Sequence, residues 1–110
     1  SNLVSLAVAM AEKLVRSELK QRPEITLDWV RDSLELVSGG EEIDILLNPA
    51  DKDALGGAIR ELVERLGRVA KTGVVADASI EPGGCVVRTR FGEVDQQLKQ
   101  QLHRLQEELG

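Results

Sequence analysis

Residues 3–20 contain neither glycine nor proline, and their apolar residues recur at spacings of three and four. Such spacing places side chains on one side of a helix, so it predicts a helix over this segment. The apolar stripe is wider than a single coiled-coil seam, and the helix therefore needs apolar neighbours on two sides. We expect its own domain to cover one row and a second copy to cover the other as a dimer seam. The expected seam is Leu3, Ala7, Met10 and Leu14, and the row beside it is Val4, Val8, Ala11 and Val15.

Pro23 ends this segment, and a second helical stripe follows. Thr26 or a residue before it is the expected cap, and Gly39 and Gly40 end the helix after Val37, since glycine accepts the left-handed conformation common at helix ends. The run 43–48 is short, apolar and rich in β-branched residues, which predicts a strand buried on at least one face.

The hydrophobic period then changes from two to 3.6, which predicts a third helix beginning at Asp51 or Asp53 as the cap. Gly56 and Gly57 lie inside this helix, where each costs about 1 kcal/mol relative to alanine. A close approach of another helix or of the sheet would be a physical reason to keep them, and loss of the first turn is the alternative.

Two further strands are expected at 74–77 and 85–90, joined by the turn-rich residues 79–84. We expect these two strands to pair as an antiparallel hairpin. After Gly92, which permits a tight exit, a terminal helix begins near Val94, with Glu93 and Asp95 favoured by the helix dipole at its start. Its stripe is the expected partner-binding surface and consists of Leu98, Leu102, Leu105 and Leu109.

The expected order is therefore α-α-β-α-β-β-α. A small three-stranded mixed sheet covered by helices is the economical arrangement for such an order, and it places the chain in the α+β class. The 110 residues suit one domain. We expect residues 1–22 to be a lead-in helix from a missing N-terminal coiled coil and residues 23–110 to be a globular docking domain.

The composition excludes several classes of function. A net charge of −5 disfavours nucleic-acid binding, which depends on Lys and Arg neutralising phosphates. No apolar run approaches the roughly 20 residues that span a bilayer, so no direct membrane insertion is expected. A single cysteine, Cys85, leaves no internal disulfide, which suits a reducing compartment and a cytoplasmic location. No cofactor is expected.

Cys85 and His103 are the one pair that could suggest a nucleophile and its base. A small Cys-dependent enzyme is therefore one alternative function. The sequence favours a buried structural cysteine and a solvated histidine, because no third orienting residue or oxyanion loop is evident.

Two other sets of residues could suggest a ligand site. The glycines of the Pro82-Gly83-Gly84 run lead into a strand and not into a helix, so a turn is expected there and not a phosphate loop. Four aspartates could supply oxygen ligands to a metal ion, but their spacing matches no calcium loop. Helix caps and turn contacts are the preferred interpretation, and Asp77 is expected to bond the loop amides around Gly83. The four are Asp51, Asp53, Asp77 and Asp95.

Two motifs carry a family resemblance. The first is Asn48-Pro49-x-Asp51 after a buried strand. The second is Asp77-x-x-Ile80-x-x-Gly83-Gly84-Cys85-x-Val87-x-Thr89-x-x-Gly92-x-Val94-Asp95, followed by the leucine helix. This pattern resembles the C-terminal domain of flagellar assembly protein FliH and of the type III secretion stators of the HrpE/YscL kind. It is more distantly similar to the E-type component of V-type ATPase peripheral stalks.

The resemblance implies an elongated homodimer whose C-terminal domain binds the N-terminal region of the export ATPase. It implies a stator and regulator without chemistry of its own. A peripheral-stalk component of a V/A-type ATPase is the alternative in the same setting.

Overall fold

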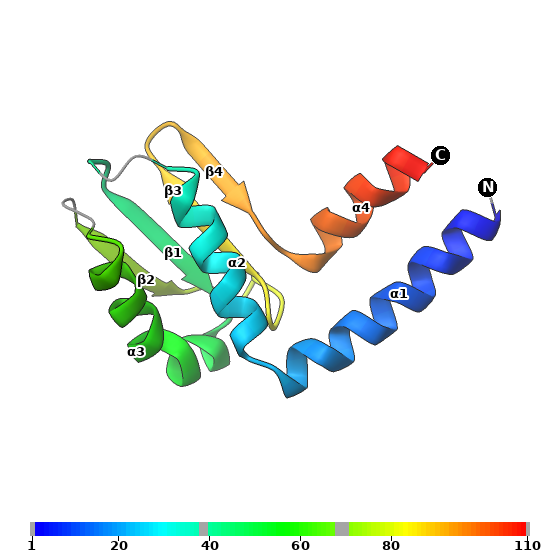
Figure 1. The fold of residues 1–110 in the computed structure, drawn as a ribbon, viewed down its shortest axis with the longest axis horizontal. Coiled ribbons are helices and arrows are strands. Elements are labelled where there is room, and N and C mark those ends of the chain that lie inside the picture. The colour runs from blue at the N-terminus through cyan, green and yellow to red at the C-terminus, as the bar shows by residue number, and fades with distance from the viewer. Residues whose placement is uncertain (1, 38–39, 68–70, 110) are drawn as a thin grey trace.

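The computed structural model describes residues 2–37, 40–67 and 71–109. Figure 1 shows a body made of the sheet with α2 and α3, from which α1 and α4 project side by side with the two termini at their far end. Within the described residues the elements are α1 (Asn2–Gln21), α2 (Glu24–Glu35), β1 (Ile43–Leu47), α3 (Pro49–Arg65), β2 (Thr72–Ala76), β3 (Cys85–Thr89), β4 (Gly92–Asp95) and α4 (Leu98–Leu109). The α+β class and the mixed sheet are confirmed.

The order of strands in the sheet is β2-β1-β3-β4. β1 pairs in parallel with β2 and antiparallel with β3, which pairs antiparallel with β4. The expected hairpin between the second and third strands is therefore wrong. β1-α3-β2 is a parallel crossover through a helix, and β3 then lies on the other side of β1. β3 is buried along Cys85, Val86 and Val87, and its central place gives both of its edges a hydrogen-bonding neighbour.

The expectation of three strands is also wrong, because Gly92–Asp95 forms a fourth. The spacing of four between Val94 and Leu98 favours a helix that includes both residues. In the structure Val94 instead packs against the core from β4, while Glu93 pairs with Arg88 of β3 at 3.2 Å. Inward and outward side chains thus alternate with the period of two that is typical of a strand. Four residues are too few for the sequence to distinguish this period from a helical spacing.

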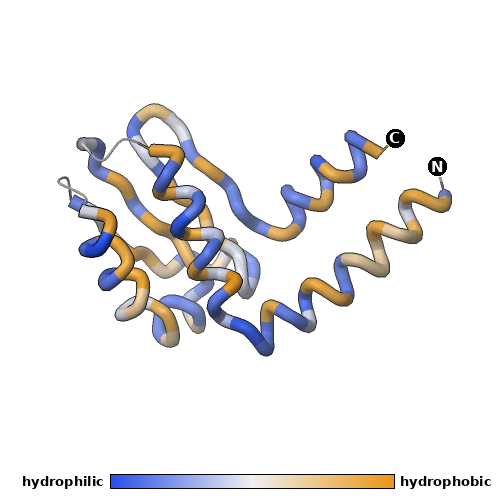
Figure 2. Tube along the Cα trace, in the orientation of Figure 1, coloured by the Kyte–Doolittle hydropathy of each residue, from blue (hydrophilic) through white to orange (hydrophobic). Residues whose placement is uncertain are grey.

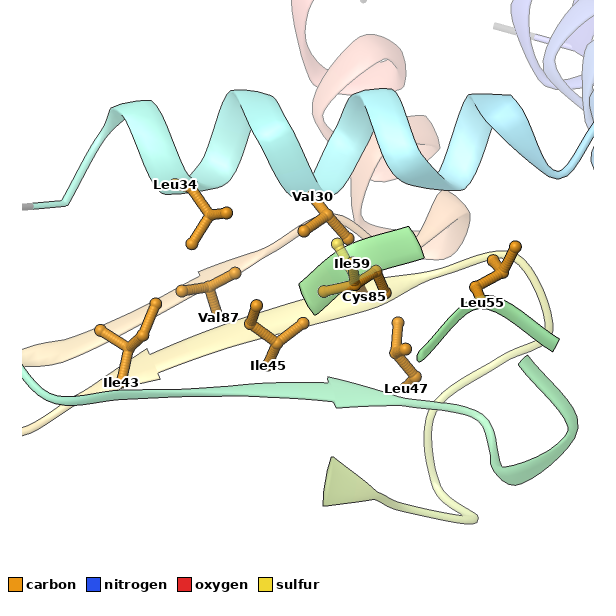
Figure 3. Packing of buried hydrophobic residues seen from close by; sticks show 9 residues of the cluster. All are labelled: Val30, Leu34, Ile43, Ile45, Leu47, Leu55, Ile59, Cys85 and Val87. Atoms are coloured by element: carbon orange, nitrogen blue, oxygen red, sulfur yellow. The ribbon is translucent and has the colours of Figure 1, made fainter. Parts of the chain in front are cut away.

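The core lies between one face of the sheet and the two helices α2 and α3. Figure 3 shows side chains of β1 and β3 directed toward the helices, and Figure 2 shows the apolar residues recurring along these elements. On the opposite face of the sheet, Leu46 and Val86 pack with Ile80 of the loop after β2. The main cluster consists of Val30, Leu34, Ile43, Ile45, Leu47, Leu55, Ile59, Cys85 and Val87.

The helix caps differ from expectation. Asn48 caps α3, accepting a hydrogen bond from the Ala50 N–H at 3.1 Å, with Pro49 at the first helical position. Asp51 lies inside the first turn and Asp53 is exposed. Thr26 is buried in α2 and caps nothing, since that helix begins at Glu24. Gly39 lies outside the described residues.

Gly56 and Gly57 lie within an α3 that keeps its first turn. A Cβ added at either position would meet nothing within 4 Å. The expected close approach does not occur between described parts of this chain, so neither of the two expected explanations for these glycines is correct.

Candidate functional site

The helices α1 and α4 form an arm that projects from the body (Figure 1). They run in opposite directions, and near the free end the Gln106 side chain donates to Ser5 Oγ at 3.3 Å. A cleft of about 630 Å³ lies between them, lined by Val8 of α1 and Leu102 of α4 among others. We call this pair of helices the arm.

The structure separates the two apolar rows of α1. Val4, Val8, Ala11 and Val15 are half-buried and form the inner row, of which Val8 lines the cleft beside α4. The other row is exposed, with 77% of Leu3 and 69% of Leu14 accessible. Leu6 is 59% exposed and joins this row, and the sequence interpretation left it out although it lies three residues after Leu3 and four before Met10. This outer row is Leu3, Leu6, Ala7, Met10 and Leu14.

The leucine stripe of α4 is embedded at its base and exposed at its tip. Leu98 is 5% exposed and belongs to the packed interior, and Leu102 is half-buried. Leu105 and Leu109 are 39% and 57% exposed. Only the last two of the four expected partner-binding leucines therefore present much of their surface to solvent.

The arm joins the body at the turn before β3. Gly83 has a φ of 84°, a conformation that favours glycine. Its N–H donates to Asp51 Oδ2 at 2.7 Å, and its carbonyl accepts from the buried Thr26 hydroxyl at 2.9 Å. A Cβ at this position would lie 3.0 Å from Leu19 of α1. Two body helices thus hold the turn against which α1 packs.

The same turn holds the start of α4. The Gln97 side-chain oxygen accepts from the Glu81 N–H at 2.9 Å, and the Gln97 N–H donates to Asp95 at 2.9 Å. Arg16 of α1 forms ion pairs with Glu81 at 3.2 Å and with Glu12 at 3.1 Å. The hydrogen bond to Glu12, together with the charge of Glu81, raises the pKa of Arg16.

A groove of about 540 Å³ lies at the base of the arm. Leu19, Pro23, Leu55 and Pro82 supply its apolar lining, and Arg16 and Lys20 of α1 add positive charge. Sequence reasoning missed this groove, because its walls come from three helices and a turn that are far apart along the chain.

Cys85 and His103 are not brought together. Cys85 is fully buried in the core cluster, and desolvation raises the pKa of its thiol to about 12. His103 is on an exposed position of α4, where its Nε2 lies 3.2 Å from Glu107. A thiol in this state is not a nucleophile at neutral pH, because attack requires the thiolate.

The four aspartates serve separate local contacts. Asp51 binds Gly83, and Asp95 accepts from Gln97 just before α4. Asp77 accepts from the Ser79 N–H at 2.9 Å and from its hydroxyl at 2.7 Å, and these bonds lower the pKa of Asp77. The expected contact of Asp77 with Gly83 is therefore wrong, and Asp51 makes it instead. Among the described residues no group of three or more His, Cys, Asp and Glu is placed to hold a metal ion.

The protein is an α+β domain with a helical arm whose α1 exposes a row of apolar side chains. The family model of flagellar assembly protein FliH matches residues 1–105. The chain belongs to this family.

Three curated relatives are named for flagellar assembly or for a type 3 secretion stator. Flagellar assembly protein FliH of Borreliella burgdorferi is 28% identical over 105 residues, covering 96% of this chain and 34% of that protein. A type 3 secretion system stator protein of Yersinia pestis is 30% identical over 81 residues, covering 74% of this chain and 37% of its own length. A probable flagellar assembly protein FliH of Bacillus subtilis is 28% identical over 107 residues, covering 97% and 51%.

The chain thus spans about a third to a half of the length of these relatives. In the part of the chain that the structure describes, no helix has both the length and the apolar character needed to cross a bilayer.

Proposed function

We propose that this chain is a non-catalytic, stator-type domain that binds the export ATPase of a flagellar or type III secretion apparatus. Its membership of the FliH family carries the proposal, together with the exposed apolar rows of the arm. The relatives are named for flagellar assembly and for a secretion stator, which favours this setting over the peripheral stalk of a V-type ATPase. The buried Cys85 weighs against a cysteine enzyme.

In this proposal the tip of α4 contributes to the ATPase-binding surface. Leu105 and Leu109 lie on one side of the helix at a spacing of four, as in an amphipathic helix that packs against a partner helix. The partner segment is the N-terminal region of the ATPase. Leu98 holds the arm to the body and is not part of the contact.

Calorimetry with the N-terminal segment of the cognate export ATPase tests the contact. Leu105→Glu with Leu109→Glu should weaken binding at least tenfold, because a charge would be desolvated on an apolar contact. Arg104→Glu is the matched control, since it adds the same side chain at an exposed position of the same helix. Circular dichroism checks that the fold is kept. Absence of binding by the unaltered chain at micromolar concentrations would refute the proposal.

We further propose that the outer row of α1 is a dimer seam. Leu3, Ala7, Met10 and Leu14 follow a spacing of four, three and four, which is that of alternating d and a positions in a heptad. In a parallel pair this register places Lys13 at g, opposite Glu18 at e of the second copy. Residues 1–22 then act in dimerisation and residues 23–110 in docking.

The molar mass in solution, measured by light scattering, tests this seam. Met10→Glu with Leu14→Glu should halve the mass at concentrations where the unaltered chain is dimeric. Lys13→Glu alone should weaken the dimer, and adding Glu18→Lys should restore it. A dimer unaffected by Met10→Glu and Leu14→Glu would show that the outer row is not the seam.

A further inference from the structure

Within the described residues, the buried contacts of the arm are confined to its base. Leu19 is the one buried residue described for α1, and Leu98 is the one described for α4. Both lie toward the ends of the two helices that are nearest the body (Figure 1). Each arm helix makes its most extensive contact with the other arm helix, and neither contacts a helix or strand of the body to the same extent. The arrangement of contacts therefore divides the molecule into two units, the arm and the body.

Two short connections join these units. Arg22 and Pro23 separate α1 from α2, and Gln96 and Gln97 separate β4 from α4. Pro23 has no N–H to donate, so the hydrogen-bond ladder of α1 does not continue without a break into α2. A few residues at the ends of helices and strands are enough to absorb the backbone rotation of a hinge.

The turn before β3, residues 81–84, leaves room for both arm helices. Gly83 lies against α1, since a Cβ at this position would be 3.0 Å from the Leu19 side chain. Gly84 lies against the start of α4, where a Cβ would be 3.2 Å from Gln97 Cα. Gly84 is not in the left-handed region, so the approach of Gln97 is the constraint on its side chain.

Glu81 adds a polar contact to each side of the arm. Its side chain pairs with Arg16 of α1 at 3.2 Å, and its N–H donates to the Gln97 side chain before α4 at 2.9 Å. The Arg16 and Glu81 side chains are 40% and 21% exposed. A partly exposed ion pair contributes little to overall stability, but it is strong enough to change the ratio of two arm directions by about fivefold.

The other side of this turn is fixed to the body. Asn48, the cap of α3, donates from its side-chain amide to the Ile80 carbonyl at 3.1 Å. Asp51 and Thr26 hold the N–H and the carbonyl of Gly83. The turn is therefore anchored in the body, and the two arm helices rest on it.

We propose that the turn 81–84 sets the direction of the arm, and that weakening its contacts lets α1 and α4 pivot together about residues 22–23 and 96–97. The direction of the arm decides where its exposed apolar residues are presented relative to the body. This device does not depend on which protein binds the arm, so it stands apart from the proposed function.

Distances between pairs of spin labels measure the direction of the arm. Ala9→Cys on α1 with Arg60→Cys on α3 gives the distance from arm to body, and both positions are exposed. Ala9→Cys with Arg104→Cys on α4 gives the distance within the arm and is the internal control. Cys85 is buried and stays unlabelled in the folded chain. An excess of unlabelled chain excludes distances between copies.

Arg16→Glu brings a third carboxylate beside Glu12 and Glu81, which should separate α1 from the turn. The arm-to-body distances should spread over about twice their original range, because more than one arm direction becomes populated, while the distance within the arm stays the same. Adding Glu81→Lys should restore the narrow range. Lys13→Glu, which makes the same change of charge at an exposed position of α1, should leave it unaltered.

Gly84→Ala tests the pivot from the other helix. Its Cβ would press on Gln97 before α4, yet the label on α1 should move with respect to the body by about 2 Å, because a small displacement at the turn is amplified over the roughly 18 Å between Ala9 and the hinge. Arm-to-body distances that Arg16→Glu leaves unchanged would overturn the proposal. A change in the distance within the arm as large as that from arm to body would overturn it too, since the arm would then not move as a unit.

Discussion

Removing the hydroxyl of Thr26 tests whether the turn before β3 is held by its buried hydrogen bond. The Thr26 hydroxyl donates to the Gly83 carbonyl at 2.9 Å, and the Thr26 side chain is 1% exposed. Thr26→Val keeps the branched shape and leaves that carbonyl unpaired in the interior. An unsatisfied buried acceptor costs about 1–3 kcal/mol, so we expect a loss of about 2 kcal/mol in the free energy of unfolding.

Urea titration followed by circular dichroism measures this loss. For a domain of this length, 1 kcal/mol corresponds to roughly 4 °C in Tm, so a shift of about 8 °C should accompany it. Thr26→Ser is the control, since it keeps the hydroxyl and removes only a methyl group. It should lose about 1 kcal/mol. A valine variant as stable as the serine variant would refute the reasoning.

Four further experiments probe the same structure. Gly83→Ala should destabilise the fold by about 2 kcal/mol in urea titration, because alanine is strained at a φ of 84° and its Cβ would press on Leu19; an unchanged midpoint would contradict this. Gly57→Ala should raise the free energy of unfolding by about 1 kcal/mol in the chain that also carries Met10→Glu and Leu14→Glu, since its Cβ meets nothing within 4 Å; a loss would show an unseen contact. Cys85 should react with a thiol reagent at pH 7 only upon unfolding, and rapid reaction of the folded chain would disprove its burial. Burial raises the pKa of the Cys85 thiol from 9.0 to about 12, so between these pH values the thiol ionises in the unfolded chain and stays protonated in the folded one. The free energy of unfolding is therefore unaffected by Cys85 below pH 9.0 and should fall above it by about 1.4 kcal/mol per pH unit up to about pH 12; Cys85→Ala should lack this slope in urea titrations at successive pH values.

The sequence predicts an element correctly where its apolar pattern extends over enough residues to distinguish a helix from a strand. Stripes of apolar residues predict α1 and α4, and short apolar runs predict β1 and β3. β4 was missed because its four residues are compatible with either period. The caps were misassigned because an aspartate near a helix start can bind its own helix or a distant amide. Asp51 accepts a hydrogen bond from the distant Gly83 N–H.

The candidate site was predicted only in part. The sequence shows two apolar rows on α1 but does not distinguish which one the domain covers, since both have the same spacing. In the structure α4 lies beside the row that contains the half-buried Val8, and Leu3 and Leu14 of the other row remain exposed. The stripe of α4 likewise predicts one continuous surface, whereas Leu98 is interior.

What the sequence determined by itself was most of the local elements, β4 excepted, together with the α+β class and the family, because periodicity, breakers and motif order act over short stretches of chain. What the tertiary structure alone decided was which strands are neighbours and where the arm joins the body. Those features depend on hydrogen bonds and contacts between residues far apart in the chain, such as Thr26 with Gly83 and Ile43 with Lys71. A short-range sequence pattern does not predict such pairings, because many different residues could form the same hydrogen bond. The packing of the folded core determines which of them come together.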